Sequence, residues 1–278
     1  MIKLPSDIII DFKSEFKSLK KLIAIVFSNF HRYGDNLNTM MNRVILIQKN
    51  EHVDVINNML VKEILGEIFT YFSFVEVIDK VEGFIRENFL NSLTPNGIPP
   101  HELVLKRNCP VMLLRNINPS KGLCNGTRLI CREFKRNVIL AEIGIGEYLG
   151  KQIFLPRIPF IPLEGDKYSV PFKRTQFLIR PCFAMTINKA QCQTLDFVGL
   201  YLPEPVFSHD QLYVSLSRAR TSENIKVLIK RHITDQTYRP RTSENIKVLI
   251  KPIDEIKSHN CCTKNVVYLE ILNLIHTT

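Results

Sequence analysis

The sequence predicts an α/β protein in which a parallel sheet with helices carries an inserted small β-rich domain. A short apolar run at residues 43–47, followed by a helical pattern, is typical of a buried parallel strand and its crossover helix. Closely spaced β-rich runs then fill residues 103–172, and the strand–helix pattern returns after them. We therefore expect three segments, residues 1–102, 103–172 and 173–278, of which the first and third build the parallel sheet.

Composition is that of an ordinary folded protein with a basic balance. Hydrophobic residues make up 45% of the 278 residues and charged residues 23%, which argues against wholesale disorder. Lys and Arg number 37 against 27 Asp and Glu, and residues 171–251 hold 13 of the basic and 6 of the acidic residues. Such an excess favours an acidic partner such as nucleic acid or an anionic membrane surface. A solvated basic surface without a partner is the open alternative.

Cysteine usage and hydropathy indicate an intracellular protein without a membrane partner. Seven cysteines are an odd number and include no C-x-x-C pair, which argues against a disulfide framework and a zinc ribbon. His259 lies near the vicinal Cys261 and Cys262, but further ligands at suitable spacing are lacking, so we predict no metal site. No apolar run approaches the roughly 20 residues of a membrane span.

The first hundred residues are expected to be mainly helical around one strand, residues 43–47. After this strand, Asn50 can cap a helix that begins at Glu51. Its predicted apolar face comprises Val53, Ile56, Met59 and Leu60.

The insert is expected to be a small barrel. Its runs VMLLRN, RLICREF, NVILAEI and QIFLPRI are separated by Gly, Asn, Pro and Lys turns. Asn125-Gly126 is a strong tight-turn signal that Gly122 supports.

Beyond the insert we predict the end of a strand leading into a helix start over residues 182–193, a buried strand over residues 198–202 and a helix over residues 208–217. The segment RTSENIKVLIK occurs twice, at Arg220–Lys230 and Arg241–Lys251. Two copies cannot form a solenoid, and only one of them can occupy a given strand position.

Four segments, in order along the chain, carry a resemblance to a known family. AMTINKAQCQTL at Ala184–Leu195 and YVSLSRAR at Tyr213–Arg220 resemble the fifth and sixth motifs of Pif-type superfamily-one helicases, including those carried by Helitron transposons. The stretch Phe89–Ile130 is similar to the lead into the family's small accessory domain. Val44–Asn57 resembles the start of its second RecA-like sheet.

The resemblance implies the C-terminal half of an ATP-dependent 5′-to-3′ DNA helicase. The family acts in DNA unwinding, repair, recombination and telomere maintenance, which implies a nuclear location. Implied partners are single-stranded DNA and an N-terminal RecA-like ATPase domain, in cis or in trans. ATP and Mg²⁺ are expected for the intact enzyme, and none is expected to be held by this chain alone.

The resemblance also implies roles for single residues. Arg218 corresponds to an arginine finger, which neutralises charge developing on the γ-phosphate. Gln191, Gln193 and Arg220 are expected to couple the strand-binding groove to the nucleotide site. Thr186, Asn188 and Lys189 are expected to bind the DNA strand. The alternatives are a solvated arginine at a helix C-terminus and an ordinary helix cap.

In the insert, the turn at Asn125-Gly126 resembles a hairpin that guides single-stranded DNA in the family. Its candidate phosphate contacts are Arg115, Lys121 and Arg128. A plain connecting turn with solvated charges is the alternative.

Two departures from the family bear on activity. No G-x-x-x-x-G-K-[ST] run occurs in the sequence; Gly144–Gln152 comes nearest, but Gln152 replaces the hydroxyl residue. Asp254-Glu255 imitates the acidic pair that would anchor Mg²⁺, but Lys251-Pro252 interrupts the strand before it, so we read it as a strand end or surface. Cys192 stands where the family has a glycine, and the added Cβ puts motor competence in doubt. A non-enzymatic single-strand-binding remnant and a decayed transposon-derived fragment are therefore alternatives to a working helicase region.

Overall fold

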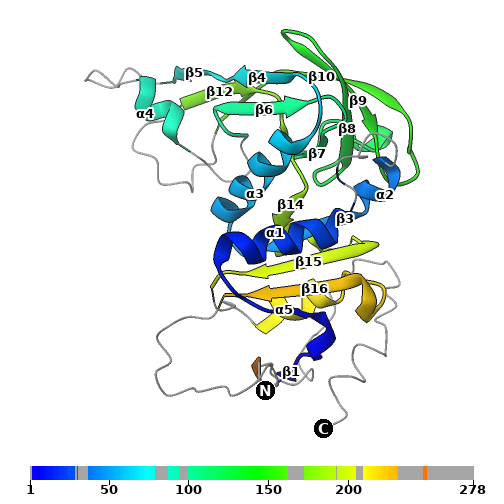
Figure 1. The fold of residues 1–278 in the computed structure, drawn as a ribbon. Coiled ribbons are helices and arrows are strands. Elements are labelled where there is room, and N and C mark those ends of the chain that lie inside the picture. The colour runs from blue at the N-terminus through cyan, green and yellow to red at the C-terminus, as the bar shows by residue number, and fades with distance from the viewer. Residues whose placement is uncertain are drawn as a thin grey trace. The chain divides into compact units, whose positions relative to one another are not determined.

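The structure is a computed structural model. In it the chain folds into two compact units (Figure 1). The first unit comprises Met1–Arg32, Asn42–Ile56 and Ala184–Thr278, and the second comprises Tyr33–Met41 and Asn57–Phe183. Described residues are 2–28, 30, 37–78, 87–93, 99–161, 172–191, 193–204, 209–230 and 247–248. Cys192, His259, Cys261 and Cys262 lie outside them, as does most of the second RTSENIKVLIK copy.

A five-stranded parallel sheet forms the centre of the first unit. Its order is β14 (Ala184–Thr186), β3 (Arg43–Ile47), β15 (Phe197–Leu202), β16 (Ile225–Ile229) and β2 (Ile9–Ile10). Strands β3 and β15 are buried over nearly their whole length, as expected of central parallel strands covered on both faces. The predicted strand at residues 43–47 is therefore confirmed, and the one at 198–202 begins a residue earlier.

Helix α1 (Glu15–Val26) packs directly on this sheet at Gly199. Its N-cap is Ser14, whose Oγ accepts a hydrogen bond from the Lys17 amide over 3.4 Å. The buried face of α1 comprises Ser18, Leu19, Leu22 and Val26. Gly199 in β15 allows the approach, because a Cβ built there would lie 2.6 Å from Val26 Cγ2.

The other helical segments only partly follow expectation. Helix α3 (Asn50–Glu63) begins one residue early and buries Val53, Ile56 and Leu60, whereas Met59 is half-buried. Helix α5 (His209–Leu216) lies within the predicted range 208–217. After β14 the predicted helix start is only a single 3-10 turn, η4 (Ile187–Ala190), because the chain must return within ten residues to begin β15. None of the described helices is long and apolar enough to cross a membrane.

The two repeat copies take different positions in the described residues. The first forms the turn η5 (Ser222–Asn224) and β16, whereas two residues of the second, β17 (Lys247–Val248), pair antiparallel with β1 (Ile2–Lys3). The copies therefore do not share one strand position.

The second unit is built from antiparallel sheets. The largest has the order β10 (Gln152–Pro156), β9 (Val138–Ile143), β8 (Arg128–Phe134), β7 (Pro110–Leu113) and β13 (Ile179–Pro181). A second has the order β11 (Ile158–Phe160), β12 (Phe172–Gln176) and β5 (Phe74–Val77). Strand β4 (Ile68–Phe72) pairs with β6 (Glu102–Lys106). Helices α2 (Leu37–Met41) and α4 (Glu87–Ser92) and the 3-10 turn η3 (Pro119–Lys121) complete its described elements.

The β-rich unit is wider than the expected insert at residues 103–172, and the described part of the first hundred residues holds the short strands β1, β2, β4 and β5 besides the expected β3. Strands β4 and β5 precede residue 103, and β12 and β13 extend the unit past residue 172. Strands β4 and β5 escape sequence reasoning because each is largely exposed and lacks a continuous apolar run. In place of a barrel, the described strands of the second unit form three separate sheets, of which the largest has β10 and β13 as its edge strands.

Candidate functional site

The segment that follows β14 is a short polar turn on the surface of the first unit. Thr186 ends β14 without capping η4, and the side chains of Asn188 and Gln191 are exposed. Gln193 folds back, and its Nε2 donates to the Lys189 carbonyl over 3.2 Å. These donors suit contacts with phosphate oxygens that carry no base preference.

Arg218, just after α5, joins this turn to α5. Its Nη1 donates to the carbonyls of Gln193 over 3.2 Å and Ala190 over 3.4 Å. Its Nε donates to the Val214 carbonyl over 3.0 Å, and its Nη2 to Ser217 Oγ over 2.9 Å. The guanidinium thus binds backbone and hydroxyl oxygens of both segments.

This placement differs from the expectation of an arginine that reaches into solvent. Arg218 is only 7% exposed, because its partners in the turn draw the guanidinium inward. The neighbouring Arg220 is exposed instead, and it pairs with Asp196 Oδ1 at 3.5 Å.

The three basic candidates of the second unit are not equivalent. Lys121 is exposed at the end of η3, and the Arg115 guanidinium stacks 4.1 Å from the centroid of the Phe160 ring. Arg128, expected to contact phosphate, is instead 3% exposed, and its Nη2 donates to the buried Cys182 carbonyl. Packing inside the unit thus removes Arg128 from the candidate surface.

The tight-turn signal at Asn125-Gly126 is confirmed. The Thr127 amide donates to the Cys124 carbonyl over 3.0 Å, and Gly126 has a φ of 89°. The turn belongs to a longer connection between β7 and β8 rather than to a two-residue hairpin.

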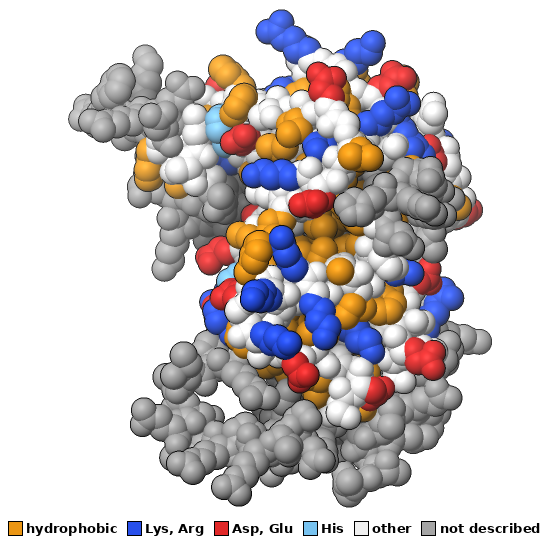
Figure 2. Space-filling model, in the orientation of Figure 1, with side chains coloured by type: hydrophobic (Ala, Val, Ile, Leu, Met, Phe, Trp, Pro, Cys, Tyr) orange, Lys and Arg blue, Asp and Glu red, His pale blue; other side chains and the backbone are white. Residues whose placement is uncertain are grey.

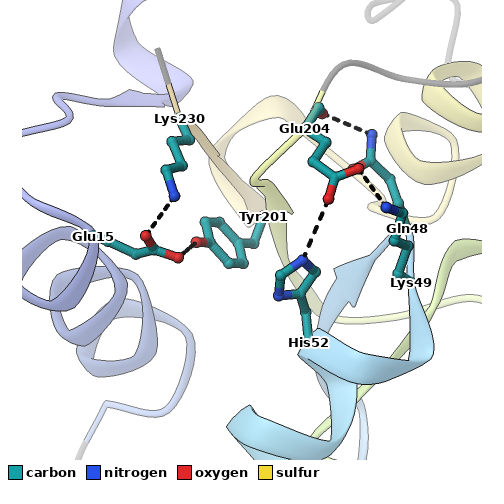
Figure 3. Close-up of polar contacts among 7 residues, drawn as sticks. All are labelled: Glu15, Gln48, Lys49, His52, Tyr201, Glu204 and Lys230. Atoms are coloured by element: carbon teal, nitrogen blue, oxygen red, sulfur yellow. Dashed lines mark hydrogen bonds and ion pairs between the residues drawn. The ribbon is translucent and has the colours of Figure 1, made fainter. Parts of the chain in front are cut away.

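A polar cluster at the carboxyl edge of the parallel sheet was not predicted (Figure 3). Glu204, just beyond β15, pairs with Lys49 at 2.6 Å and with His52 at 3.9 Å. Its backbone carbonyl accepts from Gln48 Nε2 over 3.0 Å. Ligands of open parallel sheets bind outside the carboxyl ends of the strands, so the positions after residues 47 and 202 were the available signal.

Beside this cluster, Tyr201 and Lys230 both bind the Glu15 carboxylate (Figure 3). The Lys230 ammonium, 2.5 Å away, holds the pKa of Glu15 below its ordinary value. Burial raises the pKa of the Tyr201 hydroxyl, and the neighbouring carboxylate adds to the shift. The three side chains connect α1 to strands β15 and β16.

Among the described residues, no three His, Cys, Asp or Glu side chains gather closely enough to hold a metal ion. The glycine-containing stretch 144–150 is a turn between antiparallel strands β9 and β10, rather than the strand-to-helix loop that cradles phosphates.

Comparison with known proteins identifies the relatives of this arrangement. Residues 88–134 match the family model described as DNA helicase Pif1, 2B domain. The chain is 31% identical to the rat ATP-dependent DNA helicase PIF1 over 189 residues, which are 66% of this chain and 27% of that protein. It is 33% identical to the human ATP-dependent DNA helicase PIF1 over 132 residues, 45% of this chain and 19% of that protein. The chain thus spans about a fifth to a quarter of the length of these relatives.

Solved structures agree on the fold. Bacteroides Pif1 bound to single-stranded DNA superposes with a TM-score of 0.50 at 24% identity, covering 79% of this chain and 51% of that one. Candida albicans Pif1 helicase superposes with a TM-score of 0.51 at 20% identity, covering 72% of this chain and 54% of that one. The parallel sheet is accordingly RecA-like. Together the sequence matches and the shared fold show that this chain is similar to a part of the Pif1-type helicases, and that residues 88–134 resemble their 2B domain.

Proposed function

We propose that this chain is the C-terminal region of an ATP-dependent DNA helicase that moves 5′ to 3′ along single-stranded DNA. In this proposal an N-terminal RecA-like ATPase domain, in cis or in trans, holds ATP and Mg²⁺. The rat relative is an ATP-dependent DNA helicase, which supports the proposed activity. The Bacteroides relative was solved with single-stranded DNA, which supports the proposed DNA partner. We also propose a nuclear role in repair, recombination and telomere maintenance, and this part rests only on the resemblance to the family.

The observation that carries the proposal is the link made by Arg218 between the two motif segments. Its bonds to the Ala190 and Gln193 carbonyls mean that movement of the turn after β14 changes the position of this cation. In the proposal, Thr186, Asn188 and Lys189 contact the DNA strand. Gln191, Gln193 and Arg220 couple strand binding to the nucleotide site. Once released, Arg218 stabilises charge on a γ-phosphate bound by the other domain.

ATP turnover tests this proposal. The purified chain with Mg²⁺, ATP and single-stranded DNA is expected to give no turnover. Addition of the N-terminal RecA-like domain of a related helicase should restore DNA-stimulated turnover, and Arg218→Ala should abolish it. Lys135→Ala, an exposed change in the second unit, is the control and should leave turnover intact. Robust turnover by the chain alone that Arg218→Ala abolishes, or no stimulation by the added domain, would contradict the proposal.

A second candidate function is a non-enzymatic protein that binds single-stranded nucleic acid. The internal engagement of Arg218 favours it, since this conformation presents no finger to a nucleotide. It predicts salt-dependent strand binding that Lys189→Glu with Arg220→Glu weakens, with no turnover whichever ATPase domain is added. Binding that is unchanged by this double charge reversal would exclude it.

A further inference from the structure

The outward face of α1 carries a group of lysines that the proposed function does not use. Lys17, Lys20 and Lys21 lie on the helix, and Lys13 lies just before its cap; all four are exposed. Spacings of three and four residues put the helical lysines on one side, opposite the buried Leu22 and its neighbours. Figure 2 shows Lys and Arg side chains gathered over α1 near the middle of the view.

Acidic side chains do not neutralise this face within the described part of the chain. Glu15, the acidic residue of α1, turns aside to Lys230 and Tyr201. None of the four lysines forms an ion pair with another described residue. Lys20 instead lies over the ring of Phe16, 4.5 Å from its centroid, and this ring is itself 59% exposed. The face therefore presents unneutralised positive charge beside an exposed aromatic ring.

From this face we infer a second nucleic-acid contact surface, the α1 basic face, defined as Lys13, Lys17, Lys20 and Lys21. It binds the phosphate backbone without regard to sequence, because lysine ammonium groups act as point charges and no base-reading side chain accompanies them. The surface is separate from the turn at residues 186–193, which is built on other elements. It goes beyond the helicase assignment and stands on the charges of α1 alone.

An anionic membrane is the rival acidic partner, and the packing of α1 argues against it. A helix that binds a membrane surface buries its own apolar face among the lipids. Here that face, with Leu19, Leu22 and Val26, is already buried, and a Cβ on Gly199 would collide with it. The buried apolar residues of α1 cannot reach a partner, whereas the exposed lysines can, and their charges suffice to bind a phosphate backbone.

The test compares two variants of the whole chain that lose the same charge. The first, Lys17→Gln, Lys20→Gln and Lys21→Gln, removes three of the four positive charges of the α1 basic face. The matched control, Lys135→Gln, Arg136→Gln and Lys151→Gln, removes three exposed positive charges from the second unit. Binding of a labelled duplex and of a single strand of equal length is followed by fluorescence anisotropy over a series of salt concentrations. Superimposable urea unfolding curves verify that both variants are folded.

We expect the first variant to bind at least about tenfold more weakly at low salt, with the control within about twofold of the parent. The slope of log K against log salt should fall by about 2.7 for duplex, three contacts of about 0.9 each, or by about 2.1 for a single strand. The nucleic acid, duplex or single strand, whose binding weakens more in the first variant is the one that this face binds. Replacing the same three lysines by arginine should retain binding.

Two results would overturn the inference. One is equal binding by the first variant and the control on both nucleic acids. The other is loss of sedimentation with phosphatidylserine vesicles in the first variant while its nucleic-acid binding stays at the parent level. Lys189→Glu with Arg220→Glu, measured in parallel, reports on the turn after β14, so failure of one surface is distinguishable from failure of the other.

Discussion

Arg218 donates through Nη1 to the backbone carbonyl of Gln193 across 3.2 Å, and this bond joins the end of α5 to the connection before β15. A second backbone link reinforces it, because the Leu195 amide donates to the Arg218 carbonyl over 3.1 Å. One residue therefore fixes the two segments that carry the family motifs. Any rearrangement of either segment must break or remake these contacts.

Replacing Arg218 should loosen the turn after β14. Arg218→Ala leaves the carbonyls of Ala190, Gln193 and Val214 without this donor, and we expect a loss of about 1–3 kcal/mol in unfolding free energy. Arg218→Lys should restore little, because an ammonium cannot reproduce the planar fork. Hydrogen exchange at residues 187–191 should accelerate in both variants. Arg220→Ala, the exposed neighbour, should leave exchange there unchanged; equal acceleration would refute a specific role for Arg218.

Arg174 should be a strong determinant of stability in the second unit. It is 0% exposed, and its guanidinium donates to the carbonyls of Leu90, Leu93 and Pro99. Arg174→Met keeps much of the volume but leaves these carbonyls without their donor, so we expect a loss of about 3 kcal/mol or more. Urea unfolding followed by circular dichroism measures it.

The control for this prediction is the preceding residue in β12. Lys173 is partly exposed and pairs with Glu76, so Lys173→Met should change stability by less than about 1 kcal/mol. If the two methionine variants unfold at the same urea concentration, the carbonyl contacts of Arg174 do not stabilise the unit.

The parallel sheet could be read from the sequence because its central strands are buried on both faces. Burial of this kind produces continuous apolar runs such as residues 43–47 and 197–202. Strands β4 and β5 could not be read in this way. Phe72 and Phe74 are 56% and 62% exposed, so their apolar character does not mark an inward face, and no periodic pattern distinguishes the segment from a loop.

The hydrogen-bond partners of Arg218 could not be predicted from the sequence for a different reason. Arg218 finds carbonyl partners 25 and 28 positions away, and a sequence pattern contains no information on contacts of that separation. At a helix end the local expectation is a solvated cation. Glu204, in contrast, could have been found, because it follows a predicted parallel strand at the sheet edge where ligand-binding residues gather.

Gly199 should be intolerant of any side chain because α1 lies directly over it. Gly199→Ala places a Cβ 2.6 Å from Val26 Cγ2 and 3.1 Å from Leu22 Cδ1, and we expect a loss of about 1–3 kcal/mol. A double-mutant cycle identifies the cause. In a Val26→Ala background the same change should cost less, since the methyl group in the way is gone. An identical cost in both backgrounds would show that the collision with Val26 is not responsible.

The bond between Lys230 and Glu15 should make stability depend on pH in the acid range. Because Lys230 lowers the folded-state pKa of Glu15 below about 4.5, the stabilisation is present above that value. It is lost as pH falls through the lower folded pKa. Both side chains are partly exposed, so the effect should stay below about 1 kcal/mol.

Glu15→Gln tests this dependence through the urea midpoint measured from pH 7 to pH 3. The variant should be slightly less stable than the parent at pH 7, and the two should converge as pH falls through the lowered pKa of Glu15, where the parent carboxylate takes up its proton. Glu147→Gln, an exposed change in the turn between β9 and β10, should follow the parent throughout. A constant difference between Glu15→Gln and the parent at every pH would show that the Glu15 side chain stabilises α1 through packing rather than through its charge.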